Sequence, residues 1–357
     1  MDKKAEPVEG GKQGLSMVDS SESSKAANEL EQLRNKGHEY LRARQWNEAR
    51  TAFNELLQYN HEDVDALNTL ALALDRLGDY ERMYETAQIA LQVDSGSALA
   101  LACKARALQK LDRVSEATIA NDQALLLETN LAFAWFNRSG QQLLQDRFSE
   151  SLRYAERALE LDPTDARTWC NKALALVGLN RPYEALEAVN SSLTQDPDYL
   201  LALQVKGDIL RRYARLDEVV VTMRHALEIA PEDISSLNLM AYALRSLGQF
   251  DRLLEVTQKL VQLTPDSHFA WDIHMGALRG LGRFEEASEA IDRVLEFDPT
   301  NVRYWMIKAD NLYRLQRYRE AVSVAEHALK IDDEYPPARR IHEKAMRMMY
   351  QQKKRKK

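Results

Sequence analysis

The sequence predicts an all-α fold in which a pair of helices repeats every 34 residues and the pairs stack into an elongated array. Five prolines recur at 34-residue intervals, and four tryptophans fall on a second grid with the same period. They are Pro163, Pro197, Pro231, Pro265 and Pro299, and Trp135, Trp169, Trp271 and Trp305. A proline removes an amide donor and pushes the preceding residue out of the helical region. Each proline therefore marks the end of one helix shortly before the next begins.

Composition agrees with a repeat array in a soluble protein. The 357 residues are 45% hydrophobic and 29% charged, and a single compact core of this length would be unusual. Apolar runs are too short to cross a bilayer, and no apolar stretch follows Lys3 and Lys4, which argues against a secretory signal. Cys103 and Cys170 fall in predicted helices, so we expect no disulfide framework and a cytoplasmic location.

Charge differs between the array and its C-terminal end. Residues 1–29 carry a net charge of −2 and residues 338–357 carry +8, which leaves −13 for residues 30–337 out of the total of −7. An acidic body repels polyanions. Binding to nucleic acid is therefore disfavoured, although the basic end alone could contact phosphate.

The chain divides into four parts. Residues 1–25 are poor in aromatic and branched apolar side chains, so we expect them to be disordered. Residues 26–335 hold nine tandem units without insertion: 30–63, 64–97, 98–131, 132–165, 166–199, 200–233, 234–267, 268–301 and 302–335. A one-sided apolar pattern over 336–352 predicts a capping helix, and 353–357 form a basic tail that we expect to fray.

Within a unit, two positions are small where helices must approach closely. The eighth is Gly, Ala or Ser in eight of nine units, and the twentieth is alanine in five. N-caps of first helices are predicted at Asp165, Asp233, Ser267 and Asn301, and a glycine such as Gly282 closes a first helix. Polar Asn121 stands where an apolar residue is usual, so the second helix of that unit should pack less well.

These residues resemble a known family. The spacing of Trp169, Ala173, Leu176, Ala185 and Pro197 is similar to the tetratricopeptide repeat (TPR), a 34-residue helix-turn-helix signature. The resemblance covers residues 30–335. It implies a right-handed α-α superhelix, the TPR solenoid, which binds extended peptides or partner helices in a concave groove.

The sequence contains none of the common catalytic, nucleotide-binding or metal-binding motifs. There is no P-loop, no GxGxxG, GxSxG or HExxH motif and no paired-cysteine zinc spacing, and the seven histidines have no ligand-like spacing. Carboxylates on amphipathic helices are typically solvated. We therefore expect no enzyme activity, no cofactor and no metal.

A partner-binding surface can still be located. If positions 4, 8 and 11 of a first helix pack inward, positions 2, 5, 6, 9, 12 and 13 lie on its other side and align along a groove. Its C-terminal half has apolar residues for a partner segment and arginines that would steer an acidic flank. These are Leu239, Phe269, Ile273, Met306 and Ile307, with Arg245, Arg279 and Arg314.

Other interpretations of this surface stay open. The arginines could instead interact with the partial negative charge at the C-termini of their helices. The apolar row could be buried by the superhelix itself. For a smaller patch, Leu99, Phe133 and Phe136, packing between repeats is the favoured explanation. The function predicted is a non-enzymatic scaffold or adaptor with a protein or peptide partner. Alternatives are a regulatory, non-catalytic subunit of an enzyme complex or a nucleic-acid-associated protein acting through the basic tail.

Overall fold

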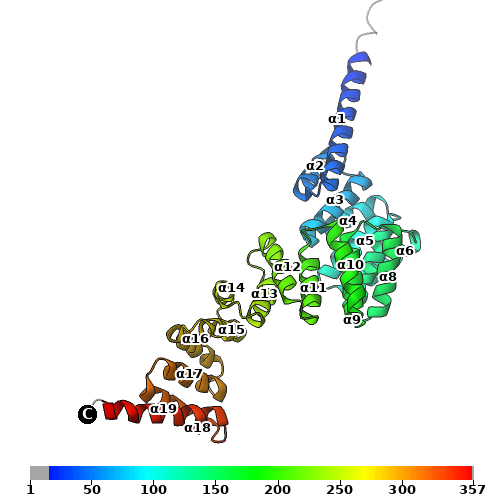
Figure 1. Cartoon of the computed structure of the whole chain (residues 1–357). Helices are drawn as coiled ribbons and strands as arrows, with labels where there is room; N and C mark the ends of the chain where they lie inside the picture. The colour runs from blue at the N-terminus through cyan, green and yellow to red at the C-terminus, as the bar shows by residue number, and fades with distance from the viewer. Residues whose placement is uncertain (1–15, 356–357) are drawn as a thin grey trace, which may run out of the picture. The chain divides into compact units, whose positions relative to one another are not determined.

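The computed structural model describes residues 16–355, which form nineteen α-helices and no strand (Figure 1). The first helices of the repeats are α1 (Ser16–Arg42), α3 (Val64–Leu77), α5 (Ala98–Lys110), α7 (Ala132–Leu143), α9 (Ala166–Gly178), α11 (Leu200–Arg212), α13 (Ile234–Ser246), α15 (His268–Gly280) and α17 (Val302–Arg314). The second helices are α2 (Trp46–Tyr59), α4 (Tyr80–Val93), α6 (Val114–Leu127), α8 (Phe148–Leu161), α10 (Pro182–Gln195), α12 (Leu216–Ile229), α14 (Phe250–Leu263), α16 (Phe284–Phe297) and α18 (Tyr318–Ile331). A last helix, α19 (Pro336–Arg355), follows them.

Helix starts keep the 34-residue period. Each first helix from α3 to α17 begins at the first position of a predicted unit, and each second helix begins at position 17. The predicted all-α fold is therefore confirmed. The chain divides into two compact units, Met1–Leu179 with α1 to α9 and Asn180–Lys357 with α10 to α19. This boundary falls inside the predicted repeat 166–199, between its two helices.

One hydrogen bond explains why proline and tryptophan share a period. The indole Nε1 of a first-helix tryptophan donates to the carbonyl oxygen of the residue six positions earlier, at the end of the preceding repeat. The pairs are Trp169 with Pro163 (2.9 Å), Trp271 with Pro265 (2.8 Å), Trp305 with Pro299 (2.7 Å) and Trp135 with Thr129 (2.7 Å). Each tryptophan thus anchors the turn that joins its repeat to the one before.

Helix caps follow the sequence closely. The side chains of Asp165, Asp233, Ser267 and Asn301 all accept a backbone N–H of the first turn of their helix, so all four predicted N-caps are confirmed. The turn inside every repeat places its fifteenth residue in the left-handed region, with φ between 55° and 74°. Only three of these nine residues are glycine, and Ala214 is among the six that are not.

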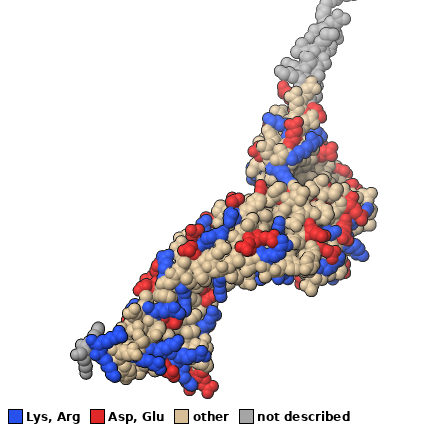
Figure 2. Space-filling view, viewed as in Figure 1, with Lys and Arg blue, Asp and Glu red and all other residues tan. Residues whose placement is uncertain are grey.

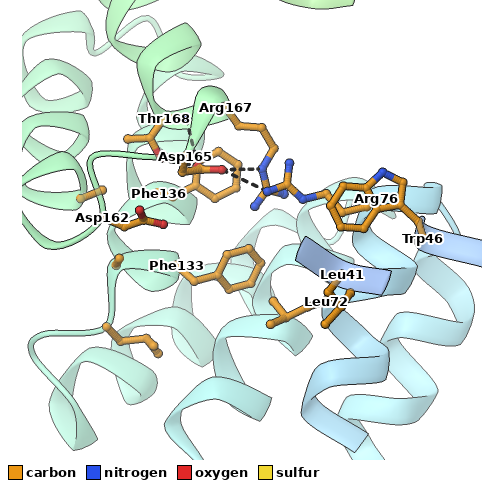
Figure 3. A pocket seen from close by; sticks show the side chains of 13 residues that line it. Leu41, Trp46, Leu72, Arg76, Phe133, Phe136, Asp162, Asp165, Arg167 and Thr168 are labelled. Atoms are coloured by element: carbon orange, nitrogen blue, oxygen red, sulfur yellow. Dashed lines mark hydrogen bonds and ion pairs between the residues drawn. The ribbon is translucent and has the colours of Figure 1, made fainter. Parts of the chain in front are cut away.

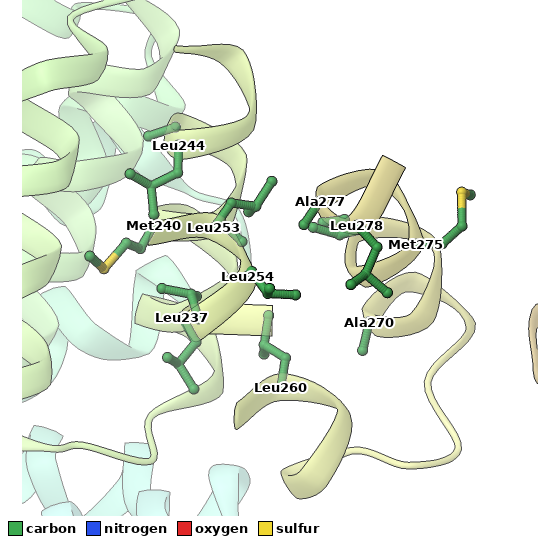
Figure 4. Packing of buried hydrophobic residues seen from close by; sticks show 14 of the residues in the cluster. Leu237, Met240, Leu244, Leu253, Leu254, Leu260, Ala270, Met275, Ala277 and Leu278 are labelled. Carbon is green, nitrogen blue, oxygen red and sulfur yellow. The ribbon is translucent and has the colours of Figure 1, made fainter. Parts of the chain in front are cut away.

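Small residues lie where helices cross closely, as predicted. Ala173 at position 8 and Ala185 at position 20 are fully buried. At Gly207, another eighth position, an added Cβ would lie 2.6 Å from the Cε atom of Met223. In the second unit the core continues from α11 to α17, and leucines of α14 lie between α13 and α15 (Figure 4). Each of these second helices therefore supports two first helices.

The ends of the chain depart from the predictions. Helix α1 begins at Ser16, so the prediction of disorder does not hold for residues 16–25, while residues 1–15 lie outside the described part of the chain. Extending an existing helix costs little, because each added residue gains a backbone hydrogen bond. Helix α19 runs to Arg355, three residues beyond its predicted end, so the basic tail is helical as far as it is described.

Helix α19 covers the end of the array. It packs on α17 and α18 and buries Ala338, Ile341 and Ala345. Figure 2 shows basic side chains gathered at this end of the second unit. Within residues 16–355 there is no helix with the length and apolar character that a bilayer span requires.

The side chain of Asn121 is itself well placed, although α6, the second helix that carries it, leaves Ile119, Leu126 and Leu127 exposed, as the prediction of looser packing expects. The Asn121 side chain is fully buried, and its Nδ2 donates to the carbonyl oxygen of Ala134 at 3.1 Å. Its Oδ1 accepts from Nδ2 of Asn137 at 3.3 Å, and Asn137 also donates to the carbonyl oxygen of Ala102 at 2.9 Å. A second buried amide therefore satisfies Asn121, while Oδ1 of Asn137 has no hydrogen-bond partner among the described residues.

Candidate functional site

Ion pairs between neighbouring first helices identify the face that these helices share in the second unit. Arg245 of α13 reaches Asp272 of α15 (Nη1 to Oδ2, 3.8 Å), and Arg279 of α15 reaches Asp310 of α17 (Nη2 to Oδ2, 2.8 Å). These residues occupy positions 12, 5 and 9 of their repeats. We call the surface of α11, α13, α15 and α17 that carries positions 2, 5, 9 and 12 the first-helix face.

Two predicted binding residues belong to the core instead. Ile273 is 2% exposed and Ile307 8%, and both lie in the apolar cluster that extends from α11 to α17. The prediction that their side chains face away from the packed helices is wrong. A first helix in a stack is covered by its own second helix and also by the neighbouring repeat, so its buried arc is wider than positions 4, 8 and 11.

The other apolar residues of the predicted row differ in exposure. Leu239 and Met306 are partly buried and pack against the same cluster, so each offers only part of its surface. Phe269, at position 2 of its repeat, is 49% exposed. Of the five apolar residues predicted to meet a partner, Phe269 is the one whose ring is about half open to solvent.

The three predicted arginines are all paired, though unequally. Arg279 and Arg314 share the carboxylate of Asp310, at 2.8 and 3.0 Å. Burial lowers the pKa of Arg279, and Asp310 opposes that shift. Arg245 is half exposed and lies 3.8 Å from Asp272, beyond hydrogen-bonding distance. Arg245 can therefore turn to an incoming anion at the lowest cost.

Two exposed residues on the same face were missed. Leu201 of α11 and Tyr242 of α13 are 40% and 45% exposed, and the guanidinium of Arg211 lies 5.4 Å from the ring centre of Tyr242. They occupy positions 2 and 9, which the helical period already assigned to the groove. The signal was thus present in the sequence.

The surface is open at Gly276, position 9 of α15. A Cβ built on this glycine would meet no atom within 4 Å. In contrast, a Cβ on Gly280, one turn later in the same helix, would lie 2.4 Å from the ring of Phe250. A larger residue at position 276 could therefore enter the space above the first-helix face without disturbing the core.

The first unit contains a pocket of about 430 Å³ (Figure 3). Leu41 of α1, Trp46 of α2 and Leu72 of α3 line it on one side, and Phe133 and Phe136 of α7 line it on the other. The start of α9 contributes Asp165, Arg167 and Thr168. The pocket thus joins the first two repeats to the fourth and fifth. Phe133 and Phe136, for which packing was the favoured explanation, also form part of its wall.

A charged network crosses the same face of the first unit. Asp75 of α3 accepts from Arg106 of α5 (Nε to Oδ1, 3.0 Å) and pairs with Nη1 of Arg167 of α9. Arg167 and Arg76 both reach Oδ1 of Asp165 at 3.2 Å. We call these five side chains the arginine–aspartate network. It connects first helices that are three repeats apart in the sequence.

Aromatic rings support this network. The guanidinium of Arg167 lies 4.6 Å from the ring centre of Phe136, and that of Arg106 lies 4.9 Å from the same ring. The guanidinium of Arg76 lies 5.4 Å from the ring of Trp46. Cation–π contacts of this kind strengthen when water is excluded. The rings therefore hold the arginine planes in place around the pocket.

The environment shifts the carboxylate pKa values downward. Burial alone would raise the pKa of Asp165, but Arg167, Arg76 and the hydrogen bonds from Thr168 outweigh it and lower the value to about 2. The pKa of Asp75 is also lowered, because Arg167 and Arg106 outweigh its burial. Burial and repulsion from Arg167 lower the pKa of Arg76. Both carboxylates are thus charged at neutral pH.

Sequence reasoning did not find this network. Asp75 and Arg167 are separated by 92 residues, and nothing in the 34-residue pattern relates residues three repeats apart. Their positions, 12 and 2, lie on the groove side of their helices, so a search for opposite charges along a diagonal of that groove could have suggested the pair.

Comparisons with known proteins bear on the fold. The sequence profile described as tetratricopeptide repeat matches residues 34–97, 143–199 and 277–337, about half of the chain. A comparison with curated proteins finds no match. PilF of Pseudomonas aeruginosa is similar in structure, with a TM-score of 0.50 and 22% identity over 57% of this chain and 93% of its own. YrrB, described as a TPR protein with an unusual peptide-binding site, has a TM-score of 0.36 and 21% identity over 52% of this chain and 96% of its own. At 22% identity the similarity to PilF concerns the fold alone.

Proposed function

This chain belongs to the tetratricopeptide repeat family, whose members generally act as non-catalytic interaction scaffolds, and we propose that it binds a peptide segment of a partner protein on the first-helix face of its second unit. The site comprises Leu201, Tyr242 and Phe269 as apolar contacts and Arg245 as the contact for an acidic group. In this proposal the protein holds its partner and performs no chemistry on it.

The observation that carries this proposal is the exposure of three large apolar side chains on successive first helices. Leu201, Tyr242 and Phe269 are each 40% to 49% exposed on α11, α13 and α15. Single exposed apolar residues are common, but several on one face indicate a partner. Tyrosine and phenylalanine bind well because they bury a large area and lose few rotatable bonds. These residues replace Ile273 and Ile307 in the predicted site.

The arginines along this face favour an acidic residue in the bound segment. Arg211 and Arg212 flank Asp208, and Arg279 and Arg314 flank Asp310, so each of these carboxylates faces two cations. Arg245 adds a cation with a weakly placed partner. Five arginines therefore stand against three carboxylates, Asp272 included, on and beside the first-helix face. An acidic side chain in the partner would be attracted to it and would orient the segment.

The proposed site can be tested with peptides selected from a random library. Peptides are selected from a random display library on the immobilised full chain, and the affinity of the best one is measured by fluorescence anisotropy for each variant. We expect Phe269→Ala and Tyr242→Ala each to weaken binding about tenfold or more, which corresponds to about 1.4 kcal/mol. Circular dichroism should show unchanged helicity, because neither side chain is buried.

Val221→Ala is the matched control. Val221 is 61% exposed on α12, a second helix of the same unit, and lies outside the first-helix face. Its removal should leave affinity unchanged. Equal losses for Val221→Ala and Phe269→Ala would show that the peptide binds exposed apolar surface without regard to position, and the proposal would fail.

A variant that fills the open space above α15 gives a second test of the binding site. Gly276→Trp places a ring into the open space above α15, where a Cβ meets nothing within 4 Å. It should block a bound segment while the core stays intact. Full affinity of the selected peptide for this variant would place the binding surface elsewhere.

A further inference from the structure

The pocket of the first unit combines an apolar floor with a cationic rim. Leu41, Leu72 and Phe133 form the floor, and the rim carries Arg76 beside Trp46 (Figure 3). Its volume of about 430 Å³ lies within the ordinary range of ligand pockets, roughly 300–1,000 Å³. The size suits one large side chain together with a neighbouring residue. It lies in α1 to α9 and shares no residue with the first-helix face of the second unit.

Arg76 shares its carboxylate partner with a second arginine. The arginine–aspartate network has three guanidinium groups and two carboxylates. Lys110 adds a fourth cation close to Asp75 and Arg106. Asp162 adds a third carboxylate, which already accepts hydrogen bonds from the backbone N–H and hydroxyl of Thr164 at 2.9 and 2.6 Å. The charges of the pocket lining balance, but Arg76 and Arg167 share Asp165, while Asp162 bonds to Thr164.

Among the three arginines, Arg76 is the one that a ligand can reach. Its side chain is 29% exposed, against 13% for Arg106 and 12% for Arg167. A guanidinium has five N–H donors, and Arg76 uses Nη2 for Asp165. A partly buried cation without its full share of opposite charge is costly. A carboxylate at the pocket mouth would remove that cost and gain charge-assisted hydrogen bonds.

We propose that this pocket is a second ligand site, which takes a large apolar side chain of a partner peptide onto Leu41, Leu72 and Phe133 and pairs the adjacent acidic side chain with Arg76. The ligand is thus a short segment with a phenylalanine-like residue next to Asp or Glu. Charge complementarity selects the acidic residue, and the apolar floor selects its neighbour. The site does not depend on the function proposed for the second unit.

The test uses peptides with blocked ends, so that the side-chain carboxylate is their single charge. The probes are acetyl-Phe-Glu-amide, acetyl-Phe-Gln-amide and acetyl-Ala-Glu-amide, titrated into the full chain. Binding is followed by tryptophan fluorescence, because Trp46 lines the pocket and the probes contain no tryptophan. We expect a saturable change with the first probe, and binding weaker by about tenfold or more with the other two.

Variants assign the binding to this pocket. Trp46→Phe should abolish the fluorescence change. Arg76→Gln should reduce the affinity for acetyl-Phe-Glu-amide to that for acetyl-Phe-Gln-amide, while Arg76→Lys should keep a preference for Glu. Arg82→Gln is the control, since Arg82 is an exposed arginine of α4 that pairs with Asp79 away from the pocket. It should change neither affinity.

Three results would overturn the proposal. The first is equal binding of the Glu and Gln probes by the unaltered protein, which needs no variant and so does not depend on how any variant folds. The second is an unchanged preference for Glu in a folded Arg76→Gln protein. The third is tighter binding of free 3-phenylpropionate than of the peptide, which would assign the pocket to a small organic acid. Loss of binding of the library-selected peptide in Phe269→Ala tests only the site of the second unit. It does not bear on the binding of the blocked dipeptides by the first unit.

Discussion

Two glycines one turn apart in α15 should respond in opposite ways to the same added methyl group. Gly276 lies inside the helix, where an added Cβ meets no atom within 4 Å. Alanine is favoured over glycine in a helix interior by about 0.8–1.0 kcal/mol, partly because glycine loses more entropy on folding. Since nothing opposes this gain, Gly276→Ala should stabilise the protein by about 0.5–1 kcal/mol.

Gly280→Ala should destabilise it. The added Cβ would lie 2.4 Å from the Cγ and Cδ1 atoms of Phe250, whereas carbon atoms pack at about 3.5–4.0 Å. These atoms are close to the backbone of Phe250, at the start of α14, so the ring cannot move aside without shifting the helix. Overpacking of this kind costs about 1–3 kcal/mol. The helix gain is smaller at the last residue of α15, so we expect a net loss of about 1–2 kcal/mol.

The measurement must resolve one part of the array, because repeat proteins do not unfold uniformly. Hydrogen exchange of the α14 and α15 amides gives the local free energy of opening, and urea unfolding followed by circular dichroism gives the overall effect. The two variants should differ by about 2 kcal/mol in the exchange of α15. Equal stabilisation by both would refute the placement of Phe250, and destabilisation by Gly276→Ala would refute the open space on the first-helix face.

Four further predictions follow from single features of the structure. Ile273→Asp should cost more than about 3 kcal/mol in thermal unfolding because it buries a charge, while Phe269→Asp on the exposed face should cost less than about 1 kcal/mol. Ala214→Gly should raise stability by about 1 kcal/mol, because Ala214 holds a φ of 55° that glycine adopts without strain. The pKa of Asp165 is depressed to about 2, so its charged form stabilises the fold at pH values above the ordinary aspartate pKa of about 3.9. About 2–3 kcal/mol should be lost in total as the pH falls from about 5 to about 1, most of it between pH 4 and 2, and Asp165→Asn should flatten this part of an acid titration. Deleting residues 336–357 should leave helicity near normal in circular dichroism but cause aggregation in light scattering, because α17 and α18 lose their cover.

Local chemistry alone determined the helices of this protein. A proline, a capping side chain such as Asp165 or a helix-closing residue such as Gly282 acts within a few residues of its own position, so helix starts can be predicted closely from the sequence. The recurrence of these signals every 34 residues also determined that each helix pair needs its neighbours, because one pair cannot bury its apolar face alone. The family resemblance rests on this same local information.

The binding surfaces depended on tertiary structure. The helical period places Ile273 on the side away from its own second helix, yet the neighbouring repeat covers it. The sequence pattern likewise does not show that Asp75 pairs with Arg167, three repeats away. How far one repeat rotates against the next results from many small packing contacts, and the rotations accumulate along the stack. The sequence pattern therefore determines which residues can face a groove, whereas the accumulated rotation decides which of them are buried, paired with one another or open to a partner.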